Sequence, residues 1–363
     1  MSERAQRLHD APWEGVFYLA GGGTSLVNEM LGTAGASRTV LDVRIPYASA
    51  AMREMLGATP EQACSETTAR AMAMAAFQQA RALQGAEGTP PASAPFGFAC
   101  TASLATDRQK KGEHRAHAAI QTPTDTYTAF WTFDGDRTAE EQALSEALWA
   151  KLGQALNIPG VEGEVVIEHT AGKPAWQALV LGDELAVATE PHAGDLILPG
   201  AFNPLHEGHR QMLDIAEAIT GRSGAYELSV ANVDKPFLDY REIETRLAQF
   251  DRPVWLTRLP TFLEKARRFP GATFVVGLDT LVRIADVRYY GNVTLRDEAL
   301  AELIEQDARY LVFGRVLDGE FKVLEDVLDR LPERIIERSS GIGADRFQNP
   351  ISSTGLRRGE SHR

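Results

Sequence analysis

The sequence predicts an α/β protein built from two domains. The chain has 363 residues, which is more than one hydrophobic core ordinarily organises. Runs rich in β-branched residues alternate with amphipathic runs of helical period, which is the order of an α/β fold. This alternation stops near Asn157 and starts again near Asp195. We therefore expect a first domain over residues 8–157, a linker or hairpin extension over 158–194, and a second domain over 195–363.

The elements of the first domain follow from periodicity and turn signals. We expect strands at Gly15–Leu19, Thr39–Ile45, Phe96–Ala102, Ala116–Ile120 and Tyr127–Phe133, and helices at 26–31, Ser65–Leu83 and Thr138–Leu156. Between the domains, two short runs suggest strands, Glu164–Glu168 and Ala178–Leu181, and we expect no helix there.

From Asp195 onward, strands and helices alternate regularly. The expected strands are Leu196–Leu198, Tyr226–Val230, Val254–Thr257, Thr273–Val276, Arg309–Phe313 and Arg334–Ile336, and the expected helices are Gly208–Ile219, Tyr240–Phe250, Leu263–Phe269 and Leu295–Glu305. This repeated order predicts a Rossmann-like, doubly wound parallel sheet. Ligands of such sheets bind beyond the carboxyl ends of the strands.

The composition limits which partners the protein can bind and in which compartment it is expected. Lys and Arg number 37 against 50 Asp and Glu, a net charge of -13, which disfavours nucleic acid and anionic membranes. The two cysteines are too few for a disulfide framework or a cysteine-only zinc site. Neither a secretory signal nor a membrane-spanning apolar run is evident. We expect a cytoplasmic protein that binds no nucleic acid and no membrane and has no metal-ligand set of its own.

The turn after the first strand of the second domain carries the main motif, Gly200-Ala-Phe-Asn-Pro-Leu-His-Glu-Gly-His209. Two histidines flank a glycine where the loop enters a helix. A helix N-terminus presents unpaired N–H groups and positive dipole to a phosphate, and Gly208 lets the backbone approach a ligand closely. His206 and His209 can each donate a hydrogen bond to phosphate oxygens. The loop is therefore a candidate ATP site.

A second motif, Ile351-Ser-Ser-Thr-Gly-Leu-Arg357, lies near the C-terminus. Three hydroxyls at an expected helix start, followed by an arginine whose fork matches phosphate geometry, predict a second anion-binding element. Two such elements at opposite ends of one α/β domain make chemical sense if the fold brings them together over one triphosphate.

These two motifs resemble the nucleotidylyltransferase superfamily, which shares an H-x-G-H fold with class I aminoacyl-tRNA synthetases. The Ile-Ser-Ser-Thr form is most similar to the nicotinamide/nicotinate mononucleotide adenylyltransferases. Gly277-Leu-Asp279 resembles their ribose-binding G-x-D segment, 229–235 their segment after the second strand, and 310–315 their later strand ending in arginine. The resemblance covers about 196–357.

The resemblance implies adenylyl transfer without a covalent enzyme intermediate, in which positioning and charge stabilisation do the catalysis. His206 and His209 would be catalytic. Magnesium would enter with ATP and bridge phosphate oxygens. The implied nucleotide-binding residues are Gly200, Ala201, Phe202, Gly208, Lys235, Gly277, Asp279, Arg315, Ser352, Ser353, Thr354 and Arg357.

Several of these residues have simpler interpretations. Phe202 is expected to pack the loop more than to touch chemistry. Asp279 could cap the following helix, Lys235 could be a solvated loop lysine, and Arg315 could belong to a salt bridge. A histidine pair at this spacing can also be a solvent-facing helix start.

The first domain resembles the CinA C-terminal, nicotinamide-nucleotide amidase family over roughly 8–157. The resemblance runs through Ala34–Ser37, Ser65–Met72, Cys100-Thr101 and Gly135–Arg137, among other segments. That family carries a nucleophilic serine after its first strand and a lysine further on.

In this chain Ala20 stands where the serine belongs, and the lysine position falls near Met52. We therefore predict a catalytically degenerate domain that binds a nucleotide, self-associates or regulates. Two alternatives stay open. Thr24 or Ser25 could substitute for the serine, and the turn Gly21–Thr24 could cradle a phosphate.

The sequence thus predicts an enzyme that transfers AMP from ATP to a phosphorylated acceptor, with nicotinamide or nicotinate mononucleotide as the expected acceptor in NAD biosynthesis or salvage. Other acceptors, such as a phosphopantetheine-like compound or a phosphocholine-like compound with CTP, are alternatives. So is a nucleotide sensor without catalysis. The resemblance of the first domain also implies homo-oligomers formed through it.

Overall fold

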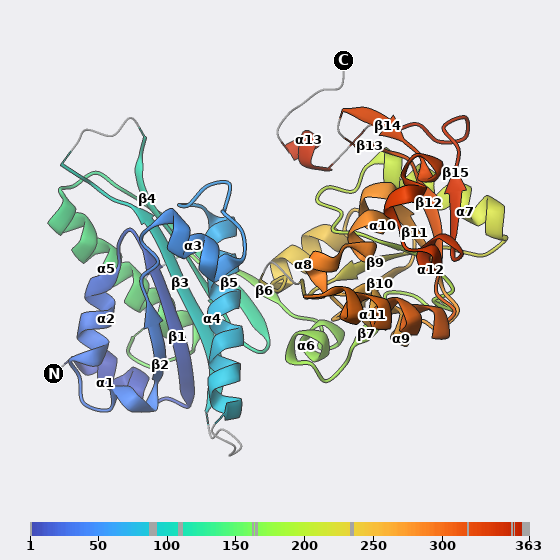
Figure 1. The fold of residues 1–363 in the computed structure, drawn as a ribbon. Coiled ribbons are helices and arrows are strands. Elements are labelled where there is room, and N and C mark those ends of the chain that lie inside the picture. Colours follow the sequence, from blue (N-terminus) through green and yellow to red (C-terminus); the bar gives the residue numbers. More distant parts are fainter. Residues whose placement is uncertain are drawn as a thin grey trace. The chain divides into compact units, whose positions relative to one another are not determined.

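The computed structural model describes residues 2–86, 93–107, 112–161, 163, 166–232, 236–317, 319–349, 351 and 353–357. The chain divides into two compact units. The first unit comprises Met1–Leu181 and Asp234–Ile243, and the second comprises Gly182–Val233 and Glu244–Arg363. Each is an α/β unit, as the sequence predicts (Figure 1). Within the described part of the chain, no helix has the length and apolar character needed to cross a bilayer.

The first unit is a six-stranded mixed sheet in the order β2-β1-β3-β4-β5-β6. β1 pairs in parallel with β2 and β3, and the remaining neighbouring pairs are antiparallel. The strands are β1 (Trp13–Ala20), β2 (Val40–Arg44), β3 (Ala94–Ser103), β4 (His114–Gln121), β5 (Asp125–Phe133) and β6 (Glu168–Ala171). The helices are α1 (Glu3–His9), α2 (Thr24–Leu31), α3 (Ser49–Leu56), α4 (Glu66–Ala86), α5 (Arg137–Ala155) and α6 (Pro174–Leu181).

Alternation along β1 builds two cores on the two faces of this sheet. Phe17 and Leu19 pack with α1, α2 and α5. Val16 and Tyr18 point the other way and pack with α3 and α4. Successive side chains of a strand face opposite sides of a sheet, so a continuous apolar run indicates a strand covered on both faces, as Figure 1 shows.

The second unit holds a seven-stranded sheet in the order β15-β12-β11-β8-β9-β10-β7. Its strands are β7 (Ala186–Ala188), β8 (Leu196–Pro199), β9 (Ala225–Ser229), β10 (Val254–Thr257), β11 (Thr273–Gly277), β12 (Arg309–Phe313) and β15 (Ser339–Ile342). All neighbouring pairs are parallel except β10 with β7. Counted from β8, the parallel strands have the order 6-5-4-1-2-3, which confirms the predicted doubly wound Rossmann-like sheet.

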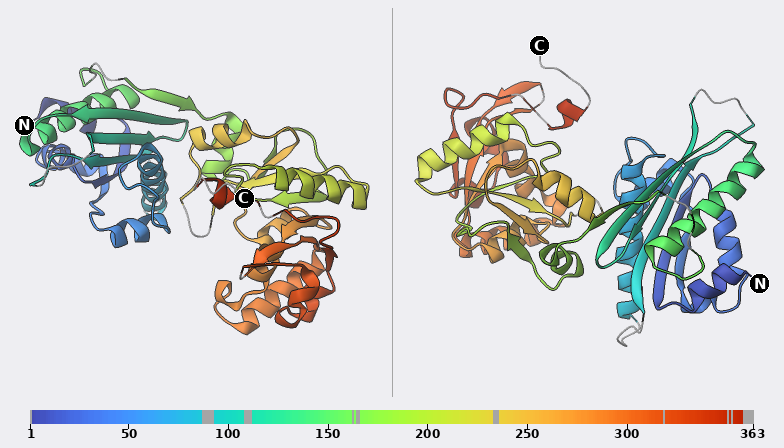
Figure 2. Two further views of the ribbon diagram at one scale, coloured as in Figure 1. Left: turned by 90° about the horizontal axis from the view of Figure 1, so that it is seen from above. Right: turned by 180° about the vertical axis from the view of Figure 1, so that it is seen from behind.

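Helices cover both faces of this second sheet (Figure 2). They are α7 (Glu207–Thr220), α8 (Tyr240–Leu247), α9 (Phe262–Arg268), α10 (Leu278–Ala285), α11 (Val293–Glu305), α12 (Glu333–Ile336) and α13 (Ser353–Arg357). A short hairpin, β13 (Arg315–Leu317) and β14 (Glu320–Lys322), follows β12. The strand order reverses between β8 and β11, where Leu196 pairs with Thr273. A crevice for a ligand is expected at this point, beyond the carboxyl ends of the strands.

Two segments differ from the sequence prediction. Residues 158–194 contain a helix, α6, which covers the expected strand Ala178–Leu181 in a stretch where no helix was expected. The other expected strand, Glu164–Glu168, lies partly outside the described residues. Pro174 is at its first position, which suits proline, and Trp176, Leu179 and Val180 are buried at helical spacing. The same stretch supplies β6 to the first sheet and β7 to the second. Residues 334–336, expected as a strand, form helix α12, and the last strand is β15.

Candidate nucleotide-binding site

His206 and His209 lie where β8 gives way to α7, at the switch point of the second sheet. His206 has extended backbone angles and is the residue that precedes the first helical turn. His209 follows one turn later, so both imidazoles lie on the same side of the helix start. Their rings are stacked, with centroids 3.6 Å apart and planes inclined by 21°. The loop and helix therefore bring the two predicted catalytic side chains into direct contact.

Phe202 anchors the loop by packing its side chain into the protein interior. Its side chain is 1% exposed, and its ring makes edge-on contacts with His209, Tyr226 and Phe250 at centroid distances of 5.1, 5.2 and 5.1 Å. Its backbone adopts a φ of 47°, which costs a non-glycine residue energy and is tolerated where packing over-determines it. Phe202 is thus a packing residue, as expected.

Both glycines of the motif make room for neighbouring side chains. A Cβ atom on Gly200 would come within 2.8 Å of the Phe202 ring. A Cβ on Gly208 would lie 3.1 Å from Nδ1 of His206. The close approach that requires glycine is therefore to the aromatic and imidazole rings of the site itself.

The two histidines are neutral hydrogen-bonding groups near pH 7. Burial, with the nearby charges of Arg315 and Arg210, lowers the pKa of His206 to about 4. Burial, followed by the neighbouring His206, lowers the pKa of His209 to about 3. The backbone N–H of His206 donates to Nδ1 of His209 over 3.3 Å, so the proton of the neutral His209 ring resides on Nε2.

Nδ1 of His206 is the open polar atom of this site. It is buried and, among the described residues, has no hydrogen-bond partner. A buried polar atom without a partner is costly and calls for a ligand or water to complete it. A phosphate oxygen at the helix start would complete it in the way that such N-termini favour.

Arg315, on β13, lies close enough to both histidines for its charge to lower their pKa values. Its side chain is 20% exposed, and its guanidinium lies 3.6 Å from the Asp279 carboxylate and donates to the sulfur of Met212 on α7 over 3.5 Å. A Cβ on Gly277 would come within 2.5 Å of Asp279 and 2.7 Å of Arg315. The structure therefore brings Gly277, Asp279 and Arg315 together and pairs the aspartate with the arginine.

The C-terminal motif returns to the loop of the first motif. The Ser353 hydroxyl donates to the carbonyl of Pro204 over 2.9 Å. The Arg357 guanidinium donates to the carbonyl of Asn203 over 2.5 Å. These two segments are about 150 residues apart in sequence, and α13 holds them side by side, as the two-motif hypothesis requires.

Two predicted residues, Lys235 and Ser352, lie outside the described residues, and a third is described only in its backbone. Thr354 is within α13, but its side chain is outside the description. Ala201 is exposed, and its carbonyl accepts a hydrogen bond from Arg246 over 2.5 Å.

Three residues next to this loop are missing from the sequence prediction. Arg210 follows the motif directly, and its charge helps to lower both histidine pKa values. Arg246 and Gln249, at the end of α8, bond to the loop backbone at Ala201, Phe202 and Leu205. Arg210 could have been predicted, because it directly follows the motif. Nothing in the sequence distinguishes Arg246 and Gln249, because polar residues on or next to an amphipathic helix are ordinarily solvated.

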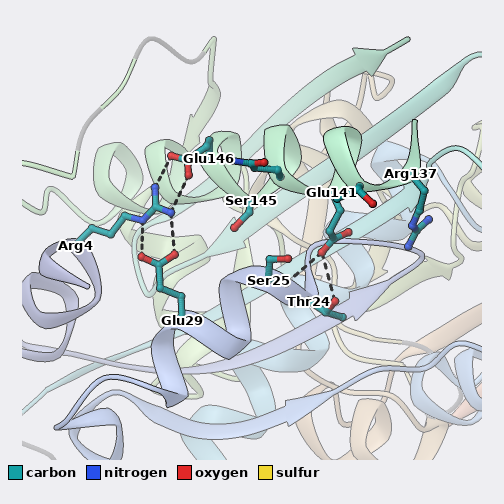
Figure 3. Close-up of a pocket in the computed structure, with 10 residues that line it drawn as sticks. Arg4, Thr24, Ser25, Glu29, Arg137, Glu141, Ser145 and Glu146 are labelled. Atoms are coloured by element: carbon teal, nitrogen blue, oxygen red, sulfur yellow. Dashed lines mark hydrogen bonds and ion pairs between the residues drawn. The ribbon is translucent and has the colours of Figure 1, made fainter. Parts of the chain in front are cut away.

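The corresponding turn of the first unit is capped by a side chain of the same unit, Glu141. The Glu141 carboxylate of α5 accepts hydrogen bonds from the backbone of Gly23 (3.0 Å) and Ser25 (3.1 Å) and from the Thr24 hydroxyl (3.3 Å). Figure 3 shows Glu141 pointing at the start of α2. The turn borders a groove of about 590 Å³ whose lining includes Arg4, Glu29 and Glu146, an ion-paired cluster.

This closure bears on the two alternatives left open for the first domain. A carboxylate already accepts the backbone N–H groups of Gly23 and Ser25 that a phosphate would need, so this helix start is capped from within the first unit. A Cβ on Gly21, which has a φ of 82°, would lie 2.0 Å from the carbonyl of Ala102, so the turn itself needs glycine. Ser25 is exposed on α2 with its backbone tied to Glu141, and Met52 is 4% exposed in the core.

Comparisons with known proteins find two groups of similar proteins. No family model matches the chain. The chain is similar to a protein of Schizosaccharomyces pombe named "Putative nicotinamide mononucleotide adenylyltransferase", with 25% identity over 166 residues, 40% of this chain and 62% of that protein. The chain thus spans less than two thirds of this relative.

Solved structures of competence- and damage-inducible proteins are also similar. One from Agrobacterium tumefaciens has 21% sequence identity and a TM-score of 0.33, covering 43% of this chain and 94% of that one. A CinA superfamily protein from Enterobacter cloacae has 18% identity and a TM-score of 0.31, covering 42% and 87%. These are the two groups of proteins that the motifs resemble.

Proposed function

We propose that the second unit transfers the adenylyl group of ATP to the phosphate of nicotinamide or nicotinate mononucleotide and releases pyrophosphate. The observation that carries this proposal is the junction of the two motifs, where Ser353 and Arg357 bond to the loop that leads into His206. The similarity to a protein named as a nicotinamide mononucleotide adenylyltransferase supports the choice of acceptor.

In the proposed reaction, a phosphate oxygen of the acceptor attacks the α-phosphorus of ATP in line. The bond from that phosphorus to the bridging oxygen breaks, and pyrophosphate leaves. Magnesium, entering as part of MgATP, neutralises charge on the phosphate oxygens. Nδ1 of His206, or its tautomeric partner atom, and Nε2 of His209 contact the reacting phosphates and stabilise charge as it develops.

The remaining residues bind the nucleotide. Ser353 and Arg357, with Ser352, Thr354 and Lys235, hold the β- and γ-phosphates. Arg357 carries a planar fork of N–H donors whose geometry matches a phosphate. Asp279 accepts from the ribose hydroxyls, and Arg315, held near it, adds positive charge to the crevice.

An acceptor panel tests the proposal. Full-length protein is mixed with MgATP and each of nicotinamide mononucleotide, nicotinate mononucleotide, phosphopantetheine and phosphocholine, and pyrophosphate release is followed. CTP replaces ATP in a parallel set. Turnover with either pyridine mononucleotide supports the proposal. Turnover with another acceptor alone would reassign the substrate, and nucleotide binding by calorimetry without any turnover would indicate a sensor.

A further inference from the structure

Gln249, in the turn that follows α8, holds the loop of the histidine motif at two backbone positions. Its side-chain oxygen accepts the N–H of Leu205 over 2.8 Å, and its side-chain nitrogen donates to the carbonyl of Phe202 over 3.4 Å. The same nitrogen lies 3.4 Å from the carbonyl of Arg246. All of these residues belong to the second unit. One carboxamide therefore bridges the two ends of the Phe202–Leu205 stretch, directly before His206.

The two contacts require a side chain that both donates and accepts hydrogen bonds. A primary amide carries an acceptor oxygen and an N–H donor side by side, which is what the N–H of Leu205 and the carbonyl of Phe202 need. Backbone groups of a folded loop require such partners. Phe202 also has a φ of 47°, a conformation that a non-glycine residue keeps only where its surroundings impose it. Gln249 is one of the residues that impose it.

Gln249 and its neighbour Phe250 also contact the part of the motif that follows the loop. The Phe250 ring packs edge-on against Phe202, with centroids 5.1 Å apart, and Phe202 in turn contacts the His209 ring at 5.1 Å. The backbone carbonyl of Gln249 accepts a hydrogen bond from Arg210 over 3.2 Å. The turn after α8 therefore supports the motif both before and after its two histidines.

This turn is fixed within the second unit. The N–H of Gln249 donates to the carbonyl of Arg246 over 3.1 Å. A few residues further on, the chain enters β10, where Val254 pairs with Tyr226 of β9. The Phe250 ring lies 4.9 Å from the Tyr226 ring. Gln249 is thus held between the end of a helix and a central strand of the sheet.

Two further carbonyls of the loop are held by the C-terminal motif. Arg357 donates to the carbonyl of Asn203 and Ser353 to that of Pro204. In the proposed function both side chains bind phosphates, so a bound nucleotide competes with the loop for their donors. Gln249 has no phosphate to bind, and its contacts with the loop are compatible with a nucleotide in the site.

We propose that Gln249 is a positioning residue for the two histidines of the motif. Its carboxamide fixes the loop backbone at Phe202 and Leu205. The N–H of His206 is thereby kept 3.3 Å from Nδ1 of His209, and this hydrogen bond determines which ring nitrogen carries the proton. The effect on catalysis rests on the proposed function, whereas the effect on the loop does not.

Amide-resolved hydrogen exchange of the full-length protein tests the positioning. Gln249→Ala removes both side-chain contacts, and Gln249→Glu keeps an acceptor for Leu205 but loses the donor. Gln306→Ala is the matched control, because Gln306 also ends a helix of the second unit, α11, and its backbone carbonyl bonds to the turn before β11. The informative amide is that of His206, because its acceptor, His209, is altered in none of the variants.

Gln249→Ala is expected to raise the exchange rate of the His206 amide about tenfold or more, and Gln249→Glu to raise it less. Nitrogen NMR of the His209 ring should also show Nδ1 shifting toward its protonated form, since the hydrogen bond that keeps it unprotonated is weakened. The control should change neither signal, and the amides of β11 and β12 should keep their wild-type rates.

A His206 amide that exchanges at the wild-type rate in Gln249→Ala would overturn the proposal. An equal rise in the amides of β11 and β12 would overturn it as well, because Gln249 would then support the whole unit and not the loop.

Kinetics distinguish this proposal from the proposed function. If adenylyl transfer occurs, Gln249→Ala should lower kcat about tenfold and leave KM for ATP within about threefold, because it displaces the histidines but removes no nucleotide ligand. Gln249→Glu should keep more of the activity. If the wild-type protein shows no transfer but the His206 amide responds to Gln249→Ala, the proposed function fails and the positioning stands. A wild-type kcat in Gln249→Ala with a faster His206 amide would overturn the catalytic part alone.

Discussion

The same local plan, a parallel strand followed by a glycine-containing turn and a helix, occurs in both units but is completed by different groups. In the first unit the N–H groups at the start of α2 bond to the Glu141 carboxylate. In the second unit the start of α7 presents two neutral imidazoles, one of which has a buried nitrogen that, among the described residues, lacks a partner. In the first turn the helix-start N–H groups bond to a side chain of the same unit. In the second, Nδ1 of His206 has no partner among the described residues.

This difference separates a turn that supports the fold from one that is available to a ligand. Both carry the glycines and the helix start that ordinarily suggest a phosphate site, so the motif alone does not discriminate between them. What discriminates is the electrostatic partner. A fixed carboxylate at the helix start repels a phosphate, whereas neutral donors near Arg315 and Arg210 attract one.

The largest expected effect is on catalysis. Replacing both histidines, His206→Ala with His209→Ala, should lower kcat for adenylyl transfer by at least about 10³-fold, because hydrogen bonds aimed at developing charge are lost. Thr24→Ala and Ser25→Ala in the first unit should leave kcat unchanged. Initial rates of pyrophosphate release at saturating MgATP measure both. Equal losses from the two sets of variants would remove the distinction between the turns.

Each unit contains a buried lysine, and the surroundings of the two lysines differ. Lys265 of the second unit is paired with Glu227 at 2.7 Å and donates to the carbonyl of Leu259 at 2.6 Å. Glu227 also accepts the Thr257 hydroxyl. Lys151 of the first unit is fully buried, and its amine is without a hydrogen-bond partner in the described part of the chain.

Lys265→Met should destabilise the second unit by about 4 kcal/mol, because it leaves the Glu227 carboxylate buried without its cation. Denaturant unfolding monitored by exchange of second-unit peptides measures the loss. The double variant Glu227→Leu with Lys265→Met should recover most of it, since an apolar pair of similar volume avoids the desolvation cost. A double variant as unstable as the single one would show that packing around Lys265, and not its charge partner, supports the unit.

Lys151→Met should instead stabilise the first unit, by on the order of 2 kcal/mol at pH 7. Burial, only partly offset by Cys100 and Glu66, lowers the pKa of Lys151 to about 7. Between that pH and the ordinary lysine value the unfolded chain binds a proton that the folded chain does not, so wild-type stability rises with pH across this window. The advantage of the variant should therefore shrink between pH 7 and pH 10. A pH-independent advantage would show that the charge is not its origin.

Much of the second unit could be predicted from the sequence because its signals are local. β10 and β12 follow from short apolar runs, and the βα alternation predicts a doubly wound parallel sheet, whose strand order the structure supplies. That the two motifs meet is expected from chemistry, since two phosphate-binding elements are useful only together, but the particular contact between Ser353 and Pro204 is not predicted by the sequence. Helix α6 was missed because its eight residues are too few for the helical period to stand out from a buried strand.

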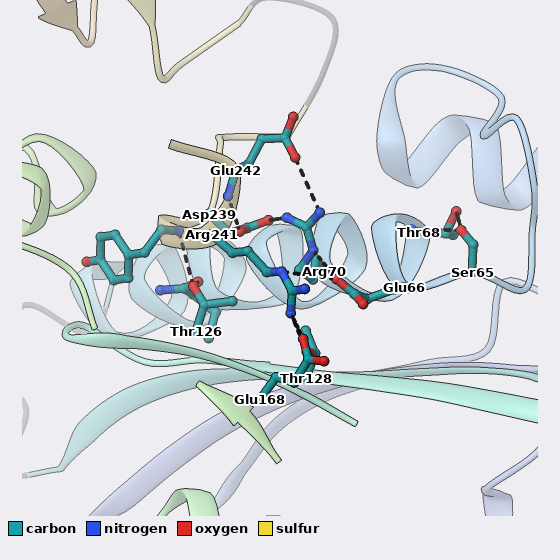
Figure 4. Close-up of polar contacts among 12 residues, drawn as sticks. Ser65, Glu66, Thr68, Arg70, Thr126, Thr128, Glu168, Asp239, Arg241 and Glu242 are labelled. Carbon is teal, nitrogen blue, oxygen red and sulfur yellow. Dashed lines mark hydrogen bonds and ion pairs between the residues drawn. The ribbon is translucent and has the colours of Figure 1, made fainter. Parts of the chain in front are cut away.

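Other features depend on contacts between residues far apart in sequence. Glu141 lies on α5, more than a hundred residues after the turn that it caps, and its own helix offers no sign of that role. Arg70 and Asp239, which pair within the first unit (Figure 4), are 169 residues apart, and each reads as an ordinary charged residue. Such pairings arise only when the fold is closed, so local pattern cannot predict them.

The smallest effect tests the closed turn itself. Glu141→Ala removes the acceptor of the Gly23 and Ser25 amides and should destabilise the first unit by about 1 kcal/mol, as the loss of a helix cap does. Glu141→Gln should cost less, because an amide oxygen still accepts these hydrogen bonds but lacks the charge that favours a helix start. Gln142→Ala, the exposed neighbour on α5, is the control and should cost little. Thermal unfolding of the first unit ranks the three, and an Ala variant as stable as the control would mean that the turn holds its shape without Glu141 and is closed by its glycines alone.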